Sequence, residues 1–370
     1  MKIAQIAPLI ERVPPKTYGG TERVVSSLTE ELVKRGHDVT LFASGDSLTA
    51  ARLVPIYPIH LRAAKLELFQ ENSVRLMGIG IPYARQDEFD IIHDHNLPFS
   101  SPSANLARTP VVATLHGPID PGNQDLYEKL PNPYIVSISH AQLPKRSTIN
   151  HVTTIYHGFD MRNYPFSEKS EDYLLYVGRI APKKGLHHAI AVAQRLNKKL
   201  IISAKIDWHI HKDYYEKEIK PHLNDQIQWI GETTELERNQ LMAHAIAFLH
   251  PALWEEPFGL TMIESLACGT PVVAFNRGSI PELIKNGKNG YVVENDGEMA
   301  DAVKNIGRID RKFCRKYALK NFNVGKMTDE YEMVYQAILQ GKSKLLKKRL
   351  KTEIFHPNFS QSEKNENSLI

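Results

Sequence analysis

The sequence has few cysteines and lacks any long apolar segment. Its only two cysteines, Cys268 and Cys314, lie in helical or small-residue contexts and predict no disulfide framework. No run approaches the roughly 18 apolar residues that a membrane span needs. The chain opens directly into the strand-like segment Lys2–Ala7, without the pattern of a signal peptide. These absences predict a cytoplasmic protein.

Most of the chain also lacks excess charge. The net charge of the whole sequence is +4, and residues 342–370 alone hold seven Lys or Arg against three Asp or Glu. Residues 1–341 are therefore formally neutral, which argues against a broad face for nucleic acid. The basic tail has leucines at near-helical spacing, and two alternatives stay open for it. It is either a solvated extension or a segment that docks on anionic lipid at the inner membrane face.

Short apolar segments alternate with helical ones through most of the 370 residues, a length that predicts two domains. They are rich in β-branched residues and apolar on both faces, as buried parallel strands should be. Between the first two lies Thr21–Arg35, whose apolar residues recur at helical spacing up to Gly36. This repeated strand–helix–strand unit predicts an α/β fold with a doubly wound sheet in each half. The predicted strands are Lys2–Ala7, Asp38–Ala43, Phe89–His93, Pro110–Leu115, Tyr134–Ile138 and Val152–Ile155, then Tyr173–Val177, Leu200–Ser203, Ile227–Ile230, Ala245–Leu249 and Pro271–Phe275.

Three further segments mark the organisation of the chain. Gly158–Ser170 is polar and contains a proline, and we interpret it as the linker between the halves. A helix over 279–285 begins with Ser279 and Glu282 at the spacing of a capping box. Met327–Leu339 is a further helix beyond the last strand. The expected divisions are an N-terminal domain 1–165, a C-terminal domain 166–326, a helix 327–341 and a basic, largely disordered tail 342–370.

Two carboxylates flank a break in the chain near residue 258. Glu256 precedes Pro257 and Gly259, whereas Glu264 follows them in an apolar-periodic segment. Because proline and glycine interrupt a helix, we expect Glu256 on a loop and Glu264 inside the next helix. Both can then face one ligand over the helix N-terminus, where amides donate to an anion and carboxylates accept from hydroxyls. A polyhydroxy ligand bearing phosphate suits this arrangement, and a plain loop acid with a solvated helix residue is the alternative.

Two cations precede another predicted helix. We expect a strand to end at Gly178, so that Arg179 and Lys184 flank the turn that follows. Cations at a helix N-terminus oppose the helix dipole, at a cost of up to about 1 kcal/mol. A bound pyrophosphate would reverse that effect, because arginine chelates two oxygens and lysine supplies a point charge. A solvated lysine-rich turn is the alternative, but the position directly after strand–Gly–Arg favours an anion site.

Glycines and histidines follow the strands of the first half. Gly19 and Gly20 join the first strand to the first helix and permit close approach of the backbone to a ligand. His116 follows a predicted strand and can reach into a cleft, a loop histidine bonded to backbone being the alternative. His93 and His95 have the spacing of a metal pair, but no third ligand is suitably spaced, so we expect no metal site.

Taken together, these features resemble the retaining GT-B glycosyltransferases of family 4. The resemblance rests on the two α/β halves, on Gly178–Arg179 with Lys184, and on the EPFGL…E segment with the following ACGTPVVA, residues 256–274. It covers about residues 1–340. It implies two Rossmann-like domains facing a cleft and a C-terminal helix, 327–339, that crosses back to the first domain. One departure is His157, in a linker-side turn where many relatives carry asparagine.

The resemblance also implies a function. A nucleotide-diphosphate sugar would be the co-substrate, bound mostly to the C-terminal domain, with no other cofactor and no divalent metal. A hexose would pass to a glycan, lipid or small-molecule acceptor with retention of anomeric configuration, and the loop 11–18 and a helix 61–77 would shape the acceptor side. By resemblance, Arg179 and Lys184 bind the diphosphate, Glu256 holds sugar hydroxyls, Glu264 accepts from the ribose, the backbone of Phe258, Gly259, Leu260 and Thr261 holds sugar and phosphate, Gly20 approaches the diphosphate, and His116 touches the sugar near the reacting carbon.

Two other classes of protein share parts of this pattern. A nicotinamide-dependent oxidoreductase is disfavoured, because no G-x-G-x-x-G follows the first strand with an acid ~20 residues on. A non-catalytic nucleotide-binding subunit is disfavoured by the joint presence of the two cations and the two carboxylates described above.

Overall fold

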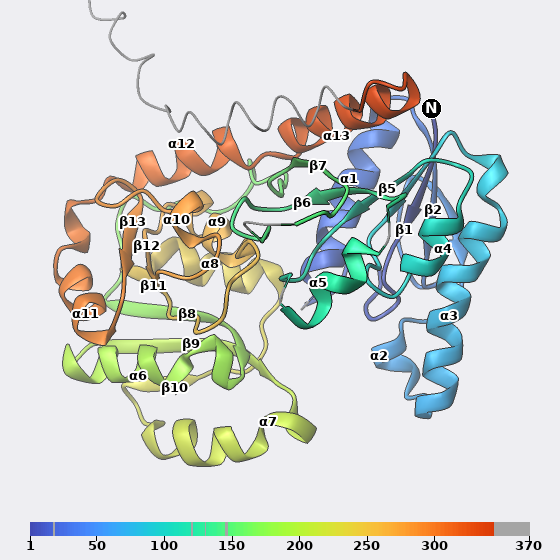
Figure 1. Ribbon diagram of the computed structural model, residues 1–370. Coiled ribbons are helices and arrows are strands. Elements are labelled where there is room, and N and C mark those ends of the chain that lie inside the picture. The colour runs from blue at the N-terminus through green and yellow to red at the C-terminus, as the bar shows by residue number, and fades with distance from the viewer. Residues whose placement is uncertain (18, 120, 130, 145–146, 344–370) are drawn as a thin grey trace, which may run out of the picture.

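The computed structural model describes residues 1–343 except 18, 120, 130 and 145–146, so most of the predicted tail lies outside the described residues. Two fully parallel sheets organise this part of the chain, each flanked by helices (Figure 1). The first has the strand order β3-β2-β1-β4-β5-β6-β7 and the second β10-β9-β8-β11-β12-β13. The predicted pair of Rossmann-like, doubly wound domains is confirmed.

The first sheet and its helices come from the first 154 residues. Its strands are β1 (Lys2–Ile6), β2 (Asp38–Ala43), β3 (Arg52–Pro55), β4 (Ile91–Asp94), β5 (Val111–Thr114), β6 (Tyr134–Ser137) and β7 (His151–Thr154). Its helices are α1 (Gly20–Lys34), α2 (Leu61–Ala64), α3 (Leu68–Ala84), α4 (Ser101–Leu106) and α5 (Pro121–Glu128).

The second sheet and its helices begin at residue 173. Its strands are β8 (Tyr173–Ile180), β9 (Lys199–Ile206), β10 (Ile227–Trp229), β11 (Ala247–His250), β12 (Val272–Phe275) and β13 (Gly290–Val293). Its helices are α6 (Leu186–Arg195), α7 (Trp208–Tyr214), α8 (Glu235–His244), α9 (Leu260–Ala267), α10 (Ile280–Leu283), α11 (Asp296–Lys304) and α12 (Arg311–Asn321), and α13 (Val324–Leu339) follows them. Within the described residues, no helix combines the length and apolar character needed to cross a membrane.

Every predicted strand is present, but two strands were missed, and the strands predicted over Tyr173–Val177 and Leu200–Ser203 ended three residues too early. The missed strands, β3 and β13, are the outermost on one side of each sheet; no residue of β3 is buried, and in β13 only Gly290 and Val293 are. The strand expected to end at Gly178 continues to Ile180, which is fully buried. Arg179 therefore lies inside β8, in register with Lys205 of β9, and not in the turn after it.

Two predicted helices differ from the structure. The helix expected over 61–77 is divided into α2 and α3, because Lys65 adopts a left-handed conformation with φ of 50°. The helix expected over 279–285 shrinks to the four residues of α10, and the capping box does not form. Ser279 has a helical backbone conformation instead of the extended one of an N-cap, and its hydroxyl donates to the carbonyl of Phe258 at 2.8 Å.

Glu282, the other half of the expected capping box, is bound elsewhere. Its carboxylate accepts from the backbone N–H groups of His140 and Ala141 and from the hydroxyl of Tyr156, at 2.7–2.9 Å. All three partners belong to the first half of the chain. The glutamate thus joins the two domains, an alternative that its local spacing could not reveal.

Helix α13 returns to the first domain, as expected of the crossover helix, and packs against α1 (Figure 1). The chain passes between the domains at two adjacent points. The N–H of Phe159 donates to the carbonyl of Phe322 at 3.0 Å, and the N–H of Val324 donates to the carbonyl of Phe159 at 3.2 Å. A Cβ on Gly158 would lie 2.2 Å from the carbonyl oxygen of Asn323, so only glycine permits this approach.

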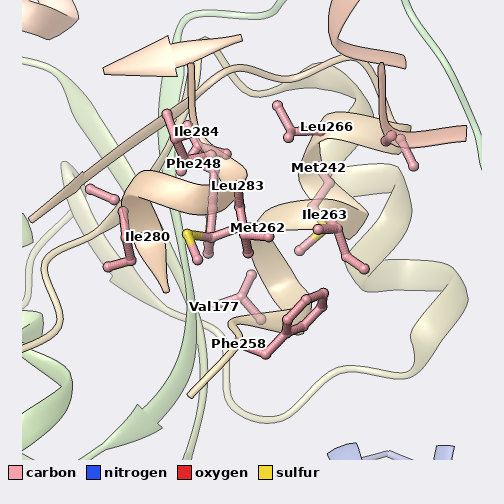
Figure 2. Packing of buried hydrophobic residues seen from close by; sticks show 14 of the residues in the cluster. Val177, Met242, Phe248, Phe258, Met262, Ile263, Leu266, Ile280, Leu283 and Ile284 are labelled. Carbon is pink, nitrogen blue, oxygen red and sulfur yellow. The ribbon is translucent and has the colours of Figure 1, made fainter. Parts of the chain in front are cut away.

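The largest hydrophobic core of the described residues supports helix α9. Met262, Ile263 and Leu266 on that helix are fully buried and pack with Phe248 of β11 and the residues of α10 (Figure 2). Phe258, just before the helix, is almost completely buried in the same cluster. Because these apolar contacts hold both ends of the segment 258–266, its polar residues are placed by the core.

Candidate active site

A cavity of about 420 Å³ lies between the two domains. Its wall contains every residue that sequence analysis singled out as a candidate for the site. The first domain contributes Gly20 and His116, and the second contributes Arg179, Lys184, Glu256, Phe258, Gly259, Leu260, Thr261 and Glu264. The individual roles of these residues remain proposals, but the sequence pattern collects them at one place.

The break between the two carboxylates is built as the proline and glycine predict. Glu256 lies on a loop, and Glu264 lies inside α9, which starts at Leu260. Gly259 precedes the helix with φ of 88°, and a Cβ there would lie 2.2 Å from the terminal carbon of Met262. Glycine therefore allows the loop to turn into the helix while Met262 stays in the core. The first residues of α9, Leu260 and Thr261, consequently line the cavity with their backbone amides at the start of the helix.

Glu256 is a buried carboxylate that receives several donors on one oxygen. Lys184 Nζ lies 2.7 Å and Trp254 Nε1 2.9 Å from Oε2, and His250 Nε2 lies 3.3 Å away. Burial alone would raise the pKa of Glu256, but the charge of Lys184 and the contact with His250 outweigh burial and hold that pKa well below its usual range. Glu256 is therefore an anion at any physiological pH.

Lys184 is held in this position by the backbone around it. It ends a short 3₁₀ turn, Pro182–Lys184, and Gly185 follows with φ of 69°. A Cβ on Gly185 would lie 1.9 Å from the carbonyl oxygen of Pro251, so the turn lies directly against the loop after β11. The buried hydroxyl of Tyr176 lies within 3.1 Å and 3.3 Å of the carbonyls of Arg179 and Lys184 and ties the two together.

Glu264 is fully buried and forms ion pairs with two arginines that sequence analysis missed. Its Oε1 lies 2.5 Å from Arg23 Nη1 and 2.9 Å from Arg238 Nη2. Its second oxygen, Oε2, has no hydrogen-bond partner among the described residues. One oxygen is thus held by protein cations, and the other is available to accept from a ligand hydroxyl.

Arg23 comes from α1 and reaches across the cavity. Besides Glu264 it contacts Glu235 at 3.1 Å and the hydroxyl of Tyr164 at 3.0 Å. A cation in the first turn of a helix opposes the dipole, which is the argument that singled out Lys184. The same argument applied to Arg23, four residues after Gly19, would have indicated a partner for it. Nothing in the local pattern of Arg238, in contrast, indicates that it reaches Glu264.

The first domain approaches α9 closely at Gly20. A Cβ on this residue would lie 3.1 Å from Leu260 Cδ1, so a larger side chain would push against the start of α9. Gly20 is the first residue of α1, and the amides of both helices therefore meet at this end of the cavity. This convergence of two helix N-termini favours binding of an anion.

Two histidines, His116 and His157, form part of the cavity wall. His116 lines the cavity, and its ring stacks on that of His157 with centroids 5.2 Å apart. His157 lies in the irregular segment just before the chain passes between the domains, and its side chain is buried in the cavity wall, a position that sequence analysis did not assign to it. His93 and His95 lie behind them, buried and bound to protein groups. In the described residues, no group of three His, Cys, Asp or Glu side chains is placed to hold a metal ion.

Comparisons with known proteins agree with this arrangement. Residues 18–162 match the family described as Glycosyltransferase Family 4, and residues 160–318 match the family described as Glycosyl transferases group 1. An uncharacterised glycosyltransferase of Methanocaldococcus jannaschii is 25% identical over 344 residues, covering 79% of this chain and 85% of the relative. The N-acetyl-alpha-D-glucosaminyl L-malate synthase of Bacillus anthracis is 22% identical over 369 residues, covering 88% and 95%.

A solved structure shares the fold. The Anabaena protein HepE, crystallised in complex with UDP and glucose, superimposes with a TM-score of 0.70 at 20% identity and covers 91% of this chain and 100% of its own. The two family matches together span residues 18–318, and the two Rossmann-like domains together have the GT-B arrangement. The chain therefore belongs to the GT-B glycosyltransferases of family 4.

Proposed function

We propose that this glycosyltransferase moves a hexose from a nucleotide-diphosphate sugar to an acceptor hydroxyl, with retention of anomeric configuration and without a divalent metal. One observation carries the proposal. A single cavity holds a lysine-bound carboxylate, a second carboxylate with an unbound oxygen, and the N-termini of two helices. Groups that accept hydrogen bonds from hydroxyls therefore lie beside groups that donate to anions, and a sugar nucleotide needs both.

The diphosphate would lie between Arg179, Lys184 and the first amides of α9. Lys184 Nζ is 2.7 Å from Glu256, so its charge is already directed toward the loop that starts α9. The backbone of Gly259, Leu260 and Thr261 would donate to diphosphate oxygens, and Gly20 leaves room for them on the opposite side. Cations and helix amides would stabilise the negative charge that develops on the departing diphosphate.

The ribose and the transferred sugar would be held by separate carboxylates. The unbound Oε2 of Glu264 is available to accept a ribose hydroxyl, with Arg23 and Arg238 keeping the carboxylate in place. Glu256 would accept from hydroxyls of the transferred hexose through its other oxygen, and Phe258 would contribute its backbone. His116, which also lines the cavity, would contact the same sugar close to the reacting carbon.

Retention is proposed to proceed by departure and attack on the same face, through an oxocarbenium-like state. Glu256 is a poor nucleophile, because Lys184 and Trp254 both bind its Oε2 and its anion is strongly stabilised. The expected product has the anomeric configuration of the donor, which NMR of the product can establish. A trapped glycosyl adduct on Glu256 would overturn this part of the proposal.

Relatives support a nucleotide-sugar donor. HepE was crystallised with UDP and glucose, and the Bacillus anthracis relative is named N-acetyl-alpha-D-glucosaminyl L-malate synthase. The acceptor of this chain is proposed to enter from the side of the first domain, where Glu11 and Arg62 line the cavity. For metal independence, the support is the pair of cations Arg179 and Lys184; turnover that is abolished by EDTA and restored by Mg²⁺ would refute it.

The test of the function is donor turnover by the purified chain. A panel of UDP-, GDP- and ADP-hexoses is screened by thermal shift. For each donor that stabilises the protein, hydrolysis is measured as the amount of nucleoside diphosphate released. We expect one base to be preferred, and we expect Lys184→Met to lose most of the turnover while Lys183→Met keeps it. Absence of both stabilisation and hydrolysis for every donor would contradict the proposal, and NAD binding would point to the rival class.

For the tail, we propose weak docking on anionic lipid from a cytoplasmic location. The support is its sequence alone, with seven basic residues between 342 and 370. Flotation with vesicles containing phosphatidylserine should recover the full chain and leave a chain ending at residue 343 in the soluble fraction. Equal recovery of the two would exclude the tail as the docking segment.

A further inference from the structure

Four histidine rings form a continuous column from the core of the first domain to the cavity. The centroids of His93 and His95 are 4.2 Å apart, those of His95 and His116 5.1 Å, and those of His116 and His157 5.2 Å. Only the last two line the cavity. The first two are buried behind them, with His93 fully buried and His95 4% exposed, and neither lines the cavity, so any role they have in transfer acts through His116 or His157.

Hydrogen bonds connect the inner end of the column to Gln5 and α13. His93 Nδ1 lies 2.6 Å from the hydroxyl of Tyr335, and His93 Nε2 lies 2.7 Å from the hydroxyl of Thr114. The Gln5 amide bridges the next step, with Nε2 3.4 Å from His93 Nδ1 and Oε1 2.9 Å from His95 Nε2. His95 Nδ1 then lies 2.9 Å from His116 Nε2.

The three rings joined by these hydrogen bonds, those of His93, His95 and His116, are neutral, and each therefore carries one N–H. Burial lowers the pKa of His93 and of His116 to about 3, and burial together with the neighbouring histidines lowers that of His95 well below its usual value. In a neutral imidazole one nitrogen donates and the other accepts. Once the nitrogen that carries the proton is known for one ring, the hydrogen bonds determine which nitrogen carries it in the next ring.

The hydrogen bond between Tyr335 and His93, at the inner end of the column, decides which group donates in each of the following hydrogen bonds. An O–H donor makes shorter bonds than an N–H donor, and the 2.6 Å separation between Tyr335 and His93 Nδ1 suits a phenol that donates to a bare nitrogen. Nδ1 of His93 then also accepts from Nε2 of Gln5, which turns Oε1 of Gln5 toward His95. His95 donates from Nε2 to that oxygen, and its bare Nδ1 accepts from Nε2–H of His116.

We propose that Gln5 and His95 are positioning residues that hold His116 in its Nε2–H tautomer, so that bare Nδ1 accepts a hydroxyl of the transferred hexose. The described part of the chain provides no hydrogen bond to Nδ1 of His116, which leaves that nitrogen for a ligand. The opposite tautomer would present an N–H there and would prefer a sugar oxygen as acceptor. The ligand half of this inference rests on the proposed function, whereas the tautomer does not.

The tautomer is read directly from the protein without donor. Two-bond ¹⁵N–¹H correlation spectra of histidine-labelled protein distinguish Nε2–H from Nδ1–H, and a His116→Gln sample assigns the signal. We expect a single Nε2–H tautomer at pH 7 that stays neutral down to pH 5. A protonated Nδ1, or an equal mixture of tautomers in the unaltered protein, would overturn the proposal.

Two nearly isosteric variants test the role of His95. His95→Asn keeps an oxygen near the position of Nδ1 that can accept from His116, whereas His95→Leu removes the acceptor. We expect the leucine variant to show mixed tautomers at His116 and to lose about tenfold in kcat/KM for the donor, and the asparagine variant to keep both within about threefold. Equal behaviour of the two folded variants contradicts positioning by hydrogen bonding.

A third variant guards against a leucine variant that does not fold. Gln5→Met preserves the length of the side chain and removes the acceptor of His95 Nε2–H, so it should also release the tautomer of His116. Should no donor be turned over by the unaltered protein, the proposed function fails while the spectra still decide the tautomer. Should turnover occur with Nδ1–H on His116, the function stands and this inference fails.

Discussion

Replacing Lys184 by methionine would separate the Lys184–Glu256 ion pair and leave a carboxylate alone in the cavity wall. Glu256 is only 7% exposed, and Lys184 is its only fully charged partner within 4 Å among the described residues. Removing one partner of a buried pair costs about 3–5 kcal/mol. Because Trp254 Nε1 and His250 still contact the carboxylate, we expect the lower end, about 3 kcal/mol.

The loss of folding stability caused by Lys184→Met should become smaller as the pH falls. In the unaltered protein the pKa of Glu256 is held below its unfolded value, so the pair contributes its full stability above about pH 4.3 and loses it only as the pH falls through that lowered pKa. In the variant, burial without Lys184 raises the pKa above the unfolded value. Its folded state then gains stability as the pH falls and Glu256 binds a proton. The stability difference should therefore shrink between pH 8 and pH 5.

Tryptophan fluorescence suits this measurement, because all three tryptophans, at 208, 229 and 254, lie in the second domain. Urea unfolding followed at these residues reports that domain alone. A loss of about 3 kcal/mol shifts the urea midpoint by about 1–2 M. The double variant Lys184→Met, Glu256→Gln should recover much of this loss, since no buried charge remains.

Lys183 provides the matched control. Its ammonium lies over the Trp254 ring at 4.4 Å, much like that of Lys184 at 4.5 Å, but only Lys184 forms an ion pair with Glu256. Lys183→Met should change the midpoint by less than about 0.5 M. Equal shifts for the two variants, or a cost independent of pH, would refute the assignment of the buried charge.

Three further predictions follow from other contacts of the site. Glu264→Gln should weaken nucleotide binding about tenfold or more, because the carboxylate bound by two arginines is lost; an unchanged affinity for UDP and GDP in tryptophan fluorescence titrations would contradict this. Gly259→Ala should lower stability by about 2 kcal/mol or more through its positive φ and its clash with Met262, and a melting temperature equal to that of the unaltered protein would contradict it. Tyr335→Phe should cost about 1 kcal/mol in the first domain by removing the shorter of the two donors to His93 Nδ1, which hydrogen exchange of β4 amides can measure.

The sequence was sufficient for the architecture and for candidates that line one cavity, because both depend on local pattern. Buried parallel strands are short apolar runs, and the Pro-x-Gly break between Glu256 and Glu264 fixes where a loop becomes a helix. Lys184 was found because a cation before a helix start is unfavourable without an anion. The same argument selected Arg179, although this residue lies inside β8 and not in the turn.

The missed features depend on contacts between distant segments. Arg238 reaches Glu264 from another helix, and Glu282 leaves its expected cap to bind backbone amides of the other domain. The order of the histidine column depends on Gln5, 88 residues before His93. No periodicity or spacing within one segment carries such information.

The adjacent passages of the chain between the domains make the second domain an insertion within the first. Helix α13, whose Tyr335 completes the inner end of the histidine column, therefore leaves the ribosome about 180 residues after the last strand of the first sheet. At translation speeds of about 5–20 residues per second, this delay is roughly ten to forty seconds. During that interval the nascent first domain carries an uncovered face with His93 beneath it. The second domain can fold in the meantime, and the site is completed last.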